Sequence, residues 1–413
     1  MSAGAPLWKV IAVWVARVLS GATFILSGWA KTVDPRGFVF KIEEYLQVWG
    51  IADSIPREIT VILAVLLALF ELTVGVLLFT GSLRRSTPVF GLLLMAFMLP
   101  LTLYIAIADP VADCGCFGDL LVISNTATFI KNIVLTGLLV ICLLWYKAAG
   151  PLYRPDLQWL VITLTCVYGL TVTTLGWQFQ PLVDFRPYGV GKSLASDAEA
   201  ESPIKYVYEK DGQKQTFSLD ALPDSTWTFV EQAFDKTSHA GLTVFDGDDE
   251  VTDDLFTPDM QGETLVIVVT EPGIDNLMRS RLANEIYDYA RSNGIQMFGL
   301  VGLAGEDLEQ WKSMATPKYP VYSASDTDLK ELVRGTVGLV YLHDGRVQWK
   351  RNFATIDPEI LSKPDPMHNL VVVDDGRVAL WLSGCYGLGM LLLLGISALT
   401  KIKIRPVRKK KVE

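Results

Sequence analysis

The sequence predicts a multi-pass α-helical membrane bundle of about six spans that carries one soluble α/β domain. Half of the 413 residues are hydrophobic and the mean hydropathy is +0.33, which is high for a soluble protein. These apolar residues gather into stretches of close to 20, the length needed to cross a hydrocarbon core about 30 Å thick. We expect spans near 8–28, 58–80, 88–108, 124–146, 157–179 and 377–399.

Basic residues set the expected orientation of these spans. The first apolar stretch is too long for a cleavable signal and is followed by no small-x-small site, so we expect it to remain as an anchor. Short cytoplasmic loops are enriched in lysine and arginine. The second and fourth loops and the C-terminal tail carry such residues, namely Arg84, Arg85, Lys147, Arg154, Lys401, Lys403, Arg405, Arg408, Lys409, Lys410 and Lys411. This predicts a bacterial inner-membrane protein with both termini cytoplasmic and its large soluble domain periplasmic.

Charge is distributed unevenly along the chain. The formal net charge is −9, yet acidic residues dominate between the fifth and sixth spans while the remainder is net basic. The only concentrated basic run is the juxtamembrane tail, which is typical of a topology determinant beside anionic lipid. We therefore expect the lipid bilayer as a partner and exclude a nucleic-acid role.

The soluble part has an alternating pattern of elements. Asp211-Gly212 lies between two short alternating segments and predicts a hairpin of 205–208 with 216–219. The apolar run 264–270 is typical of a strand buried on both faces. Helices and strands then alternate. We expect helices at 277–292, 305–314 and 326–333, strands at 295–301 and 319–323, and a closing hairpin of 337–342 with 346–351.

This pattern predicts the following domain organisation. A mixed sheet covered by helices is expected for the soluble part. The expected segments are a four-span membrane module at 1–150, a fifth span at 151–180, an exit segment with a hairpin at 181–240, the main soluble domain at 241–365, a sixth span at 366–400 and a basic cytoplasmic tail at 401–413.

Two of the five cysteines differ from the rest. Cys142, Cys166 and Cys385 fall inside predicted spans, where a thiol usually acts as a small hydrophobic group. Cys114 and Cys116 share a tight turn at the outer membrane edge, where disulfides persist. A disulfide across one glycine closes a small ring, and strained, exposed disulfides tend to be labile or catalytic.

Charged residues near this turn are candidates for tuning the two thiols. Asp113 and Asp119 flank the turn and would raise the thiol pKa values by like-charge repulsion. Lys31, at the outer end of the first span, and Lys131, about two turns into the fourth, would lower them if close. A lysine inside a span is costly and indicates a partner or a function, unless its side chain reaches the interface.

Three interpretations of Cys-Gly-Cys compete: a redox-active dithiol, a structural clip and half of a metal site. A metal site needs about four ligands, and the chain has just three histidines, His239, His343 and His368. We rank metal binding last and favour the redox dithiol over the clip.

Arg17 and Glu71 form a second candidate pair inside the membrane. Each lies roughly nine residues from the inner end of its predicted span, a depth of about 13 Å at 1.5 Å per residue. An ion pair at matching depth would satisfy both charges. We favour a structural clasp for the bundle over a proton relay.

At these residues the chain resembles a DoxX-type membrane module of the kind found in the methylamine-utilisation MauE family. The resemblance covers about residues 8–146, and the Cys-Gly-Cys-Phe-Gly turn is its most specific part. It rests on Arg17, Gly28, Lys31, Asp34-Pro35, Gly37-Phe38, Glu71, Gly75, Leu77-Leu78, Gly81, Asp113 to Gly118, and Phe129-Ile-Lys131-Asn132.

This resemblance implies support of disulfide or electron transfer outside the membrane, beside a thioredoxin-like partner. The soluble domain itself resembles a thioredoxin or peroxiredoxin fold, so such a partner looks fused to the module. It departs from that fold family at the expected cysteine pair, which reads Glu271-Pro-Gly-Ile-Asp-Asn276, and at the expected proline, which reads Thr336-Val337-Gly338. Without a thiolate the domain cannot perform thioredoxin chemistry, which favours a docking role.

Two hypotheses of different classes follow. In the first, Cys114 and Cys116 cycle between dithiol and disulfide while the cysteine-free domain orients a periplasmic redox client. In the second, the chain is a non-enzymatic structural or assembly subunit of an envelope complex. A quinone is a conceivable electron acceptor, although no residue in the sequence identifies one. A transporter is disfavoured because no paired Gly/Pro-broken spans occur.

Overall fold

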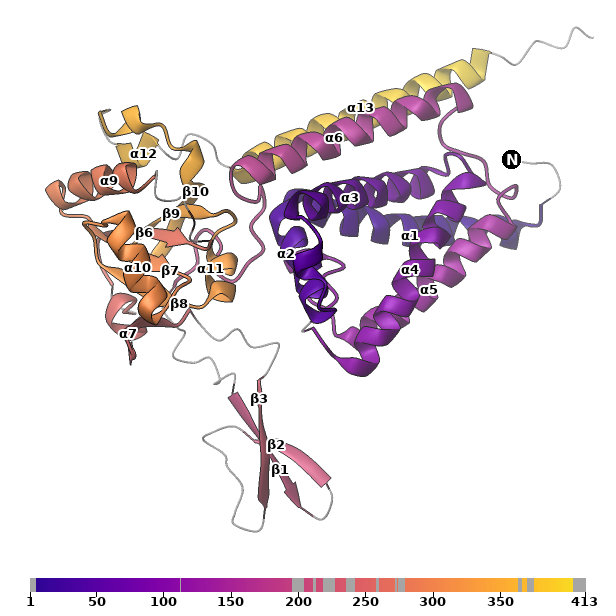
Figure 1. Ribbon diagram of the computed structural model, residues 1–413. Coiled ribbons are helices and arrows are strands. Elements are labelled where there is room, and N and C mark those ends of the chain that lie inside the picture. The colour runs from indigo at the N-terminus through magenta and orange to yellow at the C-terminus, as the bar shows by residue number, and fades with distance from the viewer. Residues whose placement is uncertain are drawn as a thin grey trace, which may run out of the picture. The chain divides into compact units, whose positions relative to one another are not determined.

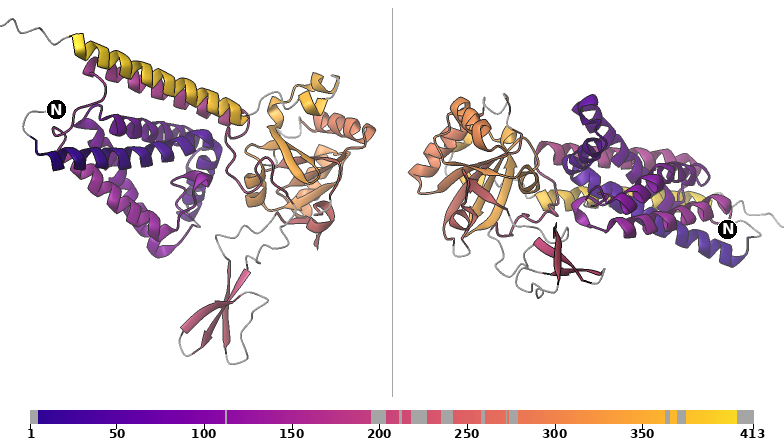
Figure 2. Two further views of the ribbon diagram at one scale, coloured as in Figure 1. Left: turned by 180° about the vertical axis from the view of Figure 1, so that it is seen from behind. Right: turned by 60° about the horizontal axis from the view of Figure 1, so that its bottom comes forward.

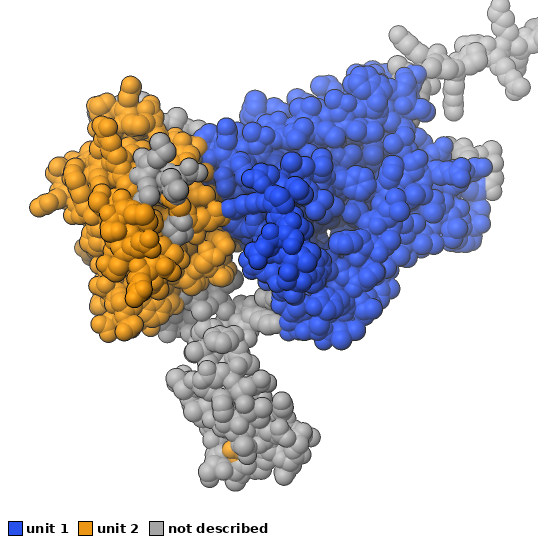
Figure 3. All heavy atoms as spheres, viewed as in Figure 1, with its two compact units in different colours: residues 1–183, 373–413 blue, residues 184–372 orange. Residues whose placement is uncertain are grey.

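The chain divides into two compact units, residues 1–183 with 373–413 and residues 184–372 (Figures 1 and 3). They are seen in a computed structural model of the full chain. The residues that the structure describes are 5–111, 113–194, 204–210, 213–217, 227–234, 242–257, 260–271, 273, 279–362, 366–369 and 375–403.

The first unit is a helical bundle. Within the described residues, six helices are long and apolar enough to cross a membrane, which confirms a multi-pass membrane protein. They are α1 (Leu7–Val33), α3 (Arg57–Thr80), α4 (Ser86–Ala108), α5 (Asn125–Leu144), α6 (Gln158–Gln178) and α13 (Asp375–Lys403). Each lies where the apolar stretches predict a span, within a few residues at either end.

Helices α1 and α3 run antiparallel at unusually close approach. A Cβ atom at Gly28 would lie 2.4 Å from the backbone nitrogen of Leu72, and one at Gly75 would lie 2.5 Å from that of Ile25. Small residues at such contacts let membrane helices approach closely and pack in van der Waals contact. This packing fixes which residues of α1 and α3 face each other.

A short amphipathic helix, α2 (Pro35–Val48), follows α1 directly. The Asp34 carboxylate accepts a hydrogen bond from Gly37 N at 2.9 Å and Pro35 takes the first helical position, so the sequence itself starts this helix. Beyond α5, helix α6 lies alongside α13 (Figures 1 and 2), where Tyr168 and Tyr386 stack at 4.5 Å between ring centroids.

The second unit is built on a mixed sheet. Its seven strands have the order β10-β9-β6-β7-β8-β4-β5, with β6, β7 and β8 parallel and β9 and β10 antiparallel. Their bounds are β4 Val244–Asp246, β5 Asp249–Glu250, β6 Glu263–Val269, β7 Gln296–Val301, β8 Val321–Ala324, β9 Val337–His343 and β10 Arg346–Asn352.

Three helices lie between these strands in the predicted order, α9 (Ser280–Ser292), α10 (Gly305–Ala315) and α11 (Asp326–Leu332). The short helices α7 (Thr252–Leu255) and α12 (Pro366–Asn369) were not predicted. The sequence pattern located β6 through β10 and their helices, whereas the short β4 and β5 were missed. These strands have three and two residues, too few for an alternating pattern of apolar and polar residues to distinguish them from a loop.

The central strand β6 separates two apolar clusters. Leu265, Ile267 and Val269 face one cluster, while Val266 and Val268 face the other, and all five side chains are at most 3 % exposed. A strand buried on both faces reads as a continuous apolar run, which is why the sequence predicted it correctly.

A separate three-stranded antiparallel sheet precedes the main sheet in the sequence. The predicted hairpin is present as β1 (Ile204–Lys210) and β2 (Gln213–Phe217), with Tyr206 opposite Phe217. Its turn, 211–212, lies outside the described residues, as does Gly241, where the main domain was expected to begin. Strand β3 (Thr228–Phe234) completes this sheet and was missed from the sequence.

The exit segment that follows α6 is tied to the second unit. Gly191 N donates to Val347 O at 2.7 Å, and Ser193 forms an isolated bridge with Arg346 of β10. Nearby, the buried Lys350 and Arg186 both pair with Asp184, at 2.9 and 2.7 Å. The exit segment therefore contacts β10, an edge strand of the sheet, as soon as the chain enters this unit.

Candidate functional site: the cysteine turn and its cavity

The connection between α4 and α5 folds into a tight turn at Cys114–Cys116. Gly115 has φ +68°, and a Cβ atom there would lie 2.6 Å from Cγ of Lys41, so both backbone and space require glycine. Cys114 Sγ and Cys116 Sγ lie 3.0 Å apart as free thiols. Cys114 is buried and Cys116 is partly buried. The two sulfur atoms need only a small displacement to form a bond.

Helix α2 fastens this turn from one side. Asp113 Oδ1 pairs with Lys41 Nζ at 2.9 Å, and its Oδ2 accepts a hydrogen bond from Gly115 N at 2.7 Å. Tyr45 donates from its hydroxyl to Cys114 O at 3.0 Å. The sequence assigned Asp113 to tuning and missed Lys41 and Tyr45. The amphipathic pattern of α2 located both residues on a helix without indicating that it packs on the turn.

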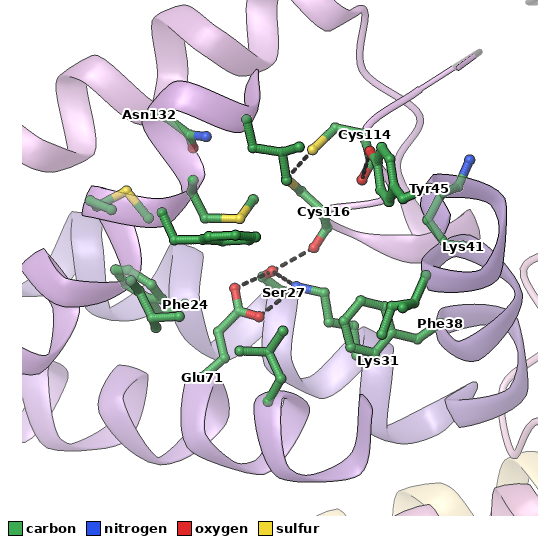
Figure 4. A pocket seen from close by; sticks show the side chains of 18 of the residues that line it. Phe24, Ser27, Lys31, Phe38, Lys41, Tyr45, Glu71, Cys114, Cys116 and Asn132 are labelled. Atoms are coloured by element: carbon green, nitrogen blue, oxygen red, sulfur yellow. Dashed lines mark hydrogen bonds and ion pairs between the residues drawn. The ribbon is translucent and has the colours of Figure 1, made fainter. Parts of the chain in front are cut away.

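Three polar side chains hold the turn from below (Figure 4). Lys31 pairs with Glu71 and donates to Ser27 Oγ at 3.0 Å, while Ser27 lies within hydrogen-bond distance of both Glu71 Oε1 and Cys116 O. Lys31 is 6 % exposed. A buried charge of this kind is tolerated when it is paired and hydrogen-bonded. Ser27, which links the ion pair to the cysteine backbone, was not identified from the sequence.

The expected Arg17–Glu71 ion pair is wrong. Arg17 donates instead to Gly150 O at 3.0 Å and Ala149 O at 3.2 Å, in the α5–α6 connection. The close contacts of Gly28 with Leu72 and Gly21 with Phe79 set the register of α1 against α3. In that register Glu71 faces Lys31. Counting depth from predicted span ends could not detect this, since it ignores how the helices pack.

The remaining tuning candidates occupy different places. Lys131 of α5 reaches back over the turn, with Nζ 4.4 Å from the ring centroid of Phe117, an attractive geometry for a cation over an aromatic face. Asp119 is exposed and does not line the cavity described below. The positive charges of Lys31 and Lys131 therefore act on the Cys116 sulfur. The negative charge of Asp113 is paired with Lys41.

These surroundings separate the acidities of the two thiols. The hydrogen bond with Cys114, together with the positive charges of Lys131 and Lys31, lowers the pKa of Cys116 to about 6, although burial and Glu71 oppose the shift. The same hydrogen bond and burial raise the pKa of Cys114 far above its ordinary value. The surroundings therefore favour ionisation of Cys116 ahead of Cys114, and the thiolate is the nucleophilic form of a cysteine.

An apolar cavity of about 210 Å³ opens beside the two cysteines (Figure 4). Helices α1, α2, α3, α4 and α5 all contribute to it. Its lining comprises Thr23, Phe24, Ser27, Lys31, Phe38, Lys41, Ile42, Tyr45, Leu46, Trp49, Leu63, Leu67, Glu71, Leu94, Met95, Phe97, Met98, Leu101, Cys114, Gly115, Cys116, Lys131, Asn132 and Leu135. The cavity was not anticipated, because its lining residues come from five helices and the cysteine turn, which are far apart in the sequence.

The described residues offer no metal cluster. No group of three or more His, Cys, Asp or Glu side chains lies close enough to hold an ion in this part of the chain. His343 pairs with Asp344, while His239 and the side chain of His368 lie outside the described residues.

The second unit carries no cysteine anywhere in its sequence. In the loop after β6, residues 272 and 274–276 lie outside the described residues. At the position expected for a proline, Thr336 O accepts a hydrogen bond from Thr270 N at 3.1 Å, and Val337 begins β9. Within the described residues, Thr270 just after β6 is hydrogen-bonded to the backbone of Gly335 and Thr336, just before β9.

Comparison with known proteins covers part of the helical bundle. A family model described as Methylamine utilisation protein MauE matches residues 9–146, which span α1 to α5. A second model, described only as a domain of unknown function (DUF8463), matches residues 203–233, the region of the three-stranded sheet. No curated protein and no solved structure matches the chain. The MauE match indicates a membrane protein of a membrane-associated pathway.

Proposed function

We propose that this chain is a thiol–disulfide electron-transfer protein in which Cys114 and Cys116 cycle between dithiol and disulfide. The observation that carries the proposal is the pair of free thiols 3.0 Å apart in a turn held by α1, α2 and α3. Oxidation of the Cys116 thiolate with the Cys114 thiol breaks the Cys114 S–H bond, forms one S–S bond and releases two electrons and one proton. A structural clip would need neither the polarised pair of thiols nor the ammonium groups beside it.

Lys31 and Lys131 stabilise the Cys116 thiolate in this proposal. A thiolate is the species that attacks a disulfide, and a thiol whose pKa lies near ambient pH is an effective attacking group. Asp113 would have the opposite effect if its charge were unpaired. Its ion pair with Lys41 therefore protects the thiolate as well as fixing the turn.

The proposed location is a bacterial inner membrane with both termini cytoplasmic. Lys41 of the α1–α3 connection contacts Asp113 of the α4–α5 connection, as loops on one side of a membrane can. Arg84 of the α3–α4 connection donates to Ala149 of the α5–α6 connection, and both loops are basic, as cytoplasmic loops are. Under this proposal residues 184–372 and the cysteine turn are both periplasmic.

The second unit is proposed to dock a periplasmic redox client. Strands β6 and β7 connected by α9, followed by the antiparallel β9–β10 hairpin, have the order expected of a thioredoxin-like domain. Since its sequence has no cysteine, it can contribute binding but no thiol exchange. Under this proposal the whole chain is a thiol–disulfide oxidoreductase whose reactive thiols lie in the membrane module.

Thiol trapping under graded reduction tests the proposal. Membranes are equilibrated in glutathione buffers of stepped potential, alkylated, and the peptide holding Cys114 and Cys116 is quantified by mass spectrometry. A single two-electron transition within the physiological range is expected, with Cys385, which is exposed, as the internal control. A pair that stays in one state at every physiological potential would sink the proposal.

The second candidate function is a non-enzymatic assembly subunit of an envelope complex. The absence of cysteine from the second unit favours it, because that unit then serves only as an interaction surface. The two functions separate in cells. If Cys114→Ser with Cys116→Ser leaves the phenotype intact while removal of 203–363 abolishes it, the assembly role is correct and the redox role is not.

A further inference from the structure

Exposed apolar side chains, two of them on membrane-spanning helices, line the cavity beside the cysteine turn. Three of its lining side chains, Leu63 of α3, Phe97 of α4 and Trp49 after α2, are 53 %, 59 % and 43 % exposed. The first two lie on membrane-spanning helices. Large apolar groups at the rim of an opening between such helices favour entry of a lipid-soluble molecule and disfavour a water-soluble one.

The interior of the cavity fits a substituted aromatic ring. An engineered cavity of roughly 150 Å³ holds benzene, and this one measures about 210 Å³. Phe24, Phe38 and Met95 supply flat or adaptable apolar walls.

The cavity lining also carries polar and reactive side chains. Cys116 lines the cavity together with Lys131, and Asn132 contributes a side-chain amide. Asn132 is 2 % exposed and donates to Thr102 Oγ1 at 3.3 Å. A few polar donors at one end of an apolar pocket orient a ligand that carries ring carbonyls.

We propose that this cavity binds a membrane quinone as the electron acceptor of the Cys114–Cys116 dithiol. The inference rests on the proposed function and adds its acceptor. The Cys116 thiolate and the Cys114 thiol form one S–S bond as the Cys114 S–H bond breaks. The two electrons, the proton from Cys114 and a second proton from solvent convert the two ring carbonyls of the quinone into the hydroxyls of the quinol. An aromatic two-electron acceptor that diffuses in the bilayer matches the apolar mouth, the ring-sized interior and the adjacent dithiol together.

A rate measurement with a matched pair of variants tests the inference. Purified full-length protein is reduced, freed of reductant and mixed with decylubiquinone, whose ring is fully substituted and has no open carbon for thiol addition. We expect one quinol formed per Cys114–Cys116 pair oxidised. Leu94→Trp, which fills the cavity, should slow this oxidation at least tenfold. Leu93→Trp on the same helix is 62 % exposed and outside the lining, and should not.

Diamide, a water-soluble thiol oxidant, separates the two levels of the proposal. If diamide oxidises the pair and decylubiquinone does not, or if both tryptophan variants react equally fast, the quinone inference is overturned and the thiol–disulfide function stands. If neither oxidant converts the dithiol to a disulfide, the proposed function itself fails.

A protection experiment covers the case in which Leu94→Trp does not fold. In Cys114→Ser protein no disulfide can form within the pair, so decylubiquinone should bind without reacting. It should then slow alkylation of Cys116 in a saturable manner and leave Cys385 unaffected. Unchanged alkylation of Cys116 at saturating decylubiquinone would contradict the inference.

Discussion

The two units use buried charge in different ways. In the helical unit, Lys31 and Glu71 form an ion pair beside the cavity. Ser27 connects this ion pair to the backbone carbonyl of Cys116. In the mixed-sheet unit, Asp184 is enclosed by Arg186 and Lys350, which are 1 % and 2 % exposed and neutralise it. The first arrangement leaves the Cys116 thiol beside the charges. The second consists of ion pairs that only stabilise the folded unit. Under our proposal, reactivity and docking therefore belong to separate units.

Loss of Asp184 should give the largest effect, confined to the second unit. Asp184→Asn leaves Lys350 and Arg186 buried without their carboxylate, and breaking a buried pair costs about 3–5 kcal/mol. Thermal unfolding of the full chain followed by limited proteolysis should show early loss of residues 184–372. The matched control Asp288→Asn, in an exposed pair with Lys318, should change stability by less than about 0.5 kcal/mol.

Acid should act on the same pair. Burial alone would raise the pKa of Asp184, but Arg186 and Lys350 overcome this and hold it well below its usual range. Its contribution is therefore fully present above the unfolded-state value of about 3.9 and is lost as pH falls below it. Circular dichroism of the wild type against Asp184→Asn should show the difference in stability shrinking under acid. A difference that stays constant with pH would contradict this.

Crowding the α1–α3 contact should come next in size. Gly28→Leu places a side chain where Leu72 backbone atoms already lie, and overpacking costs about 1–3 kcal/mol. We expect a lower unfolding temperature of the helical unit. We also expect slower alkylation of Cys116, with a smaller difference in rate from the other cysteines. Gly137→Leu is the control, because no atom lies within 4 Å of a Cβ there. Equal behaviour of the two variants would show that this contact does not position the site.

Removing one ammonium group should change the reactivity of Cys116 without affecting the fold. Lys131→Gln should raise the pH midpoint of Cys116 alkylation from about 6 by roughly one unit, equivalent to about 1.4 kcal/mol. The thiolate fraction near neutral pH falls accordingly. Peptide-resolved alkylation rates across pH measure this, with Lys147→Gln, near the other end of α5, as the control. An unchanged midpoint would mean that Lys131 acts only through its contact with Phe117.

The smallest expected effect comes from Asp113→Asn. The amide oxygen can still accept the hydrogen bond from Gly115, but the ion pair with Lys41 is lost. Partly exposed ion pairs contribute about 0–1 kcal/mol, so the redox midpoint of the cysteine pair should shift only slightly. A large shift would show that the charge of Asp113, rather than its hydrogen bond, sets the geometry of the turn.

The sequence predicted what depends on periodicity and local chemistry. Apolar length located the six long helices, and the unbroken run 264–270 located the central strand. Cys-Gly-Cys identified the turn because it is a purely local signal, and in the structure Gly115 has φ +68°, a conformation that favours glycine. The partner of Glu71, the contact of Ser27 with Cys116 and the cavity depend on helix register and on residues far apart in sequence, which one-dimensional patterns do not contain.

The most direct measurement of the central claim is the midpoint potential of the Cys114–Cys116 pair with and without residues 203–363. If the chemistry belongs to the membrane unit and the second unit only docks a client, the two potentials should agree within about 30 mV, or 1.4 kcal/mol. Both proteins should show one two-electron transition. A pair fixed in one state, or a transition that disappears on removal of the second unit, would contradict the account.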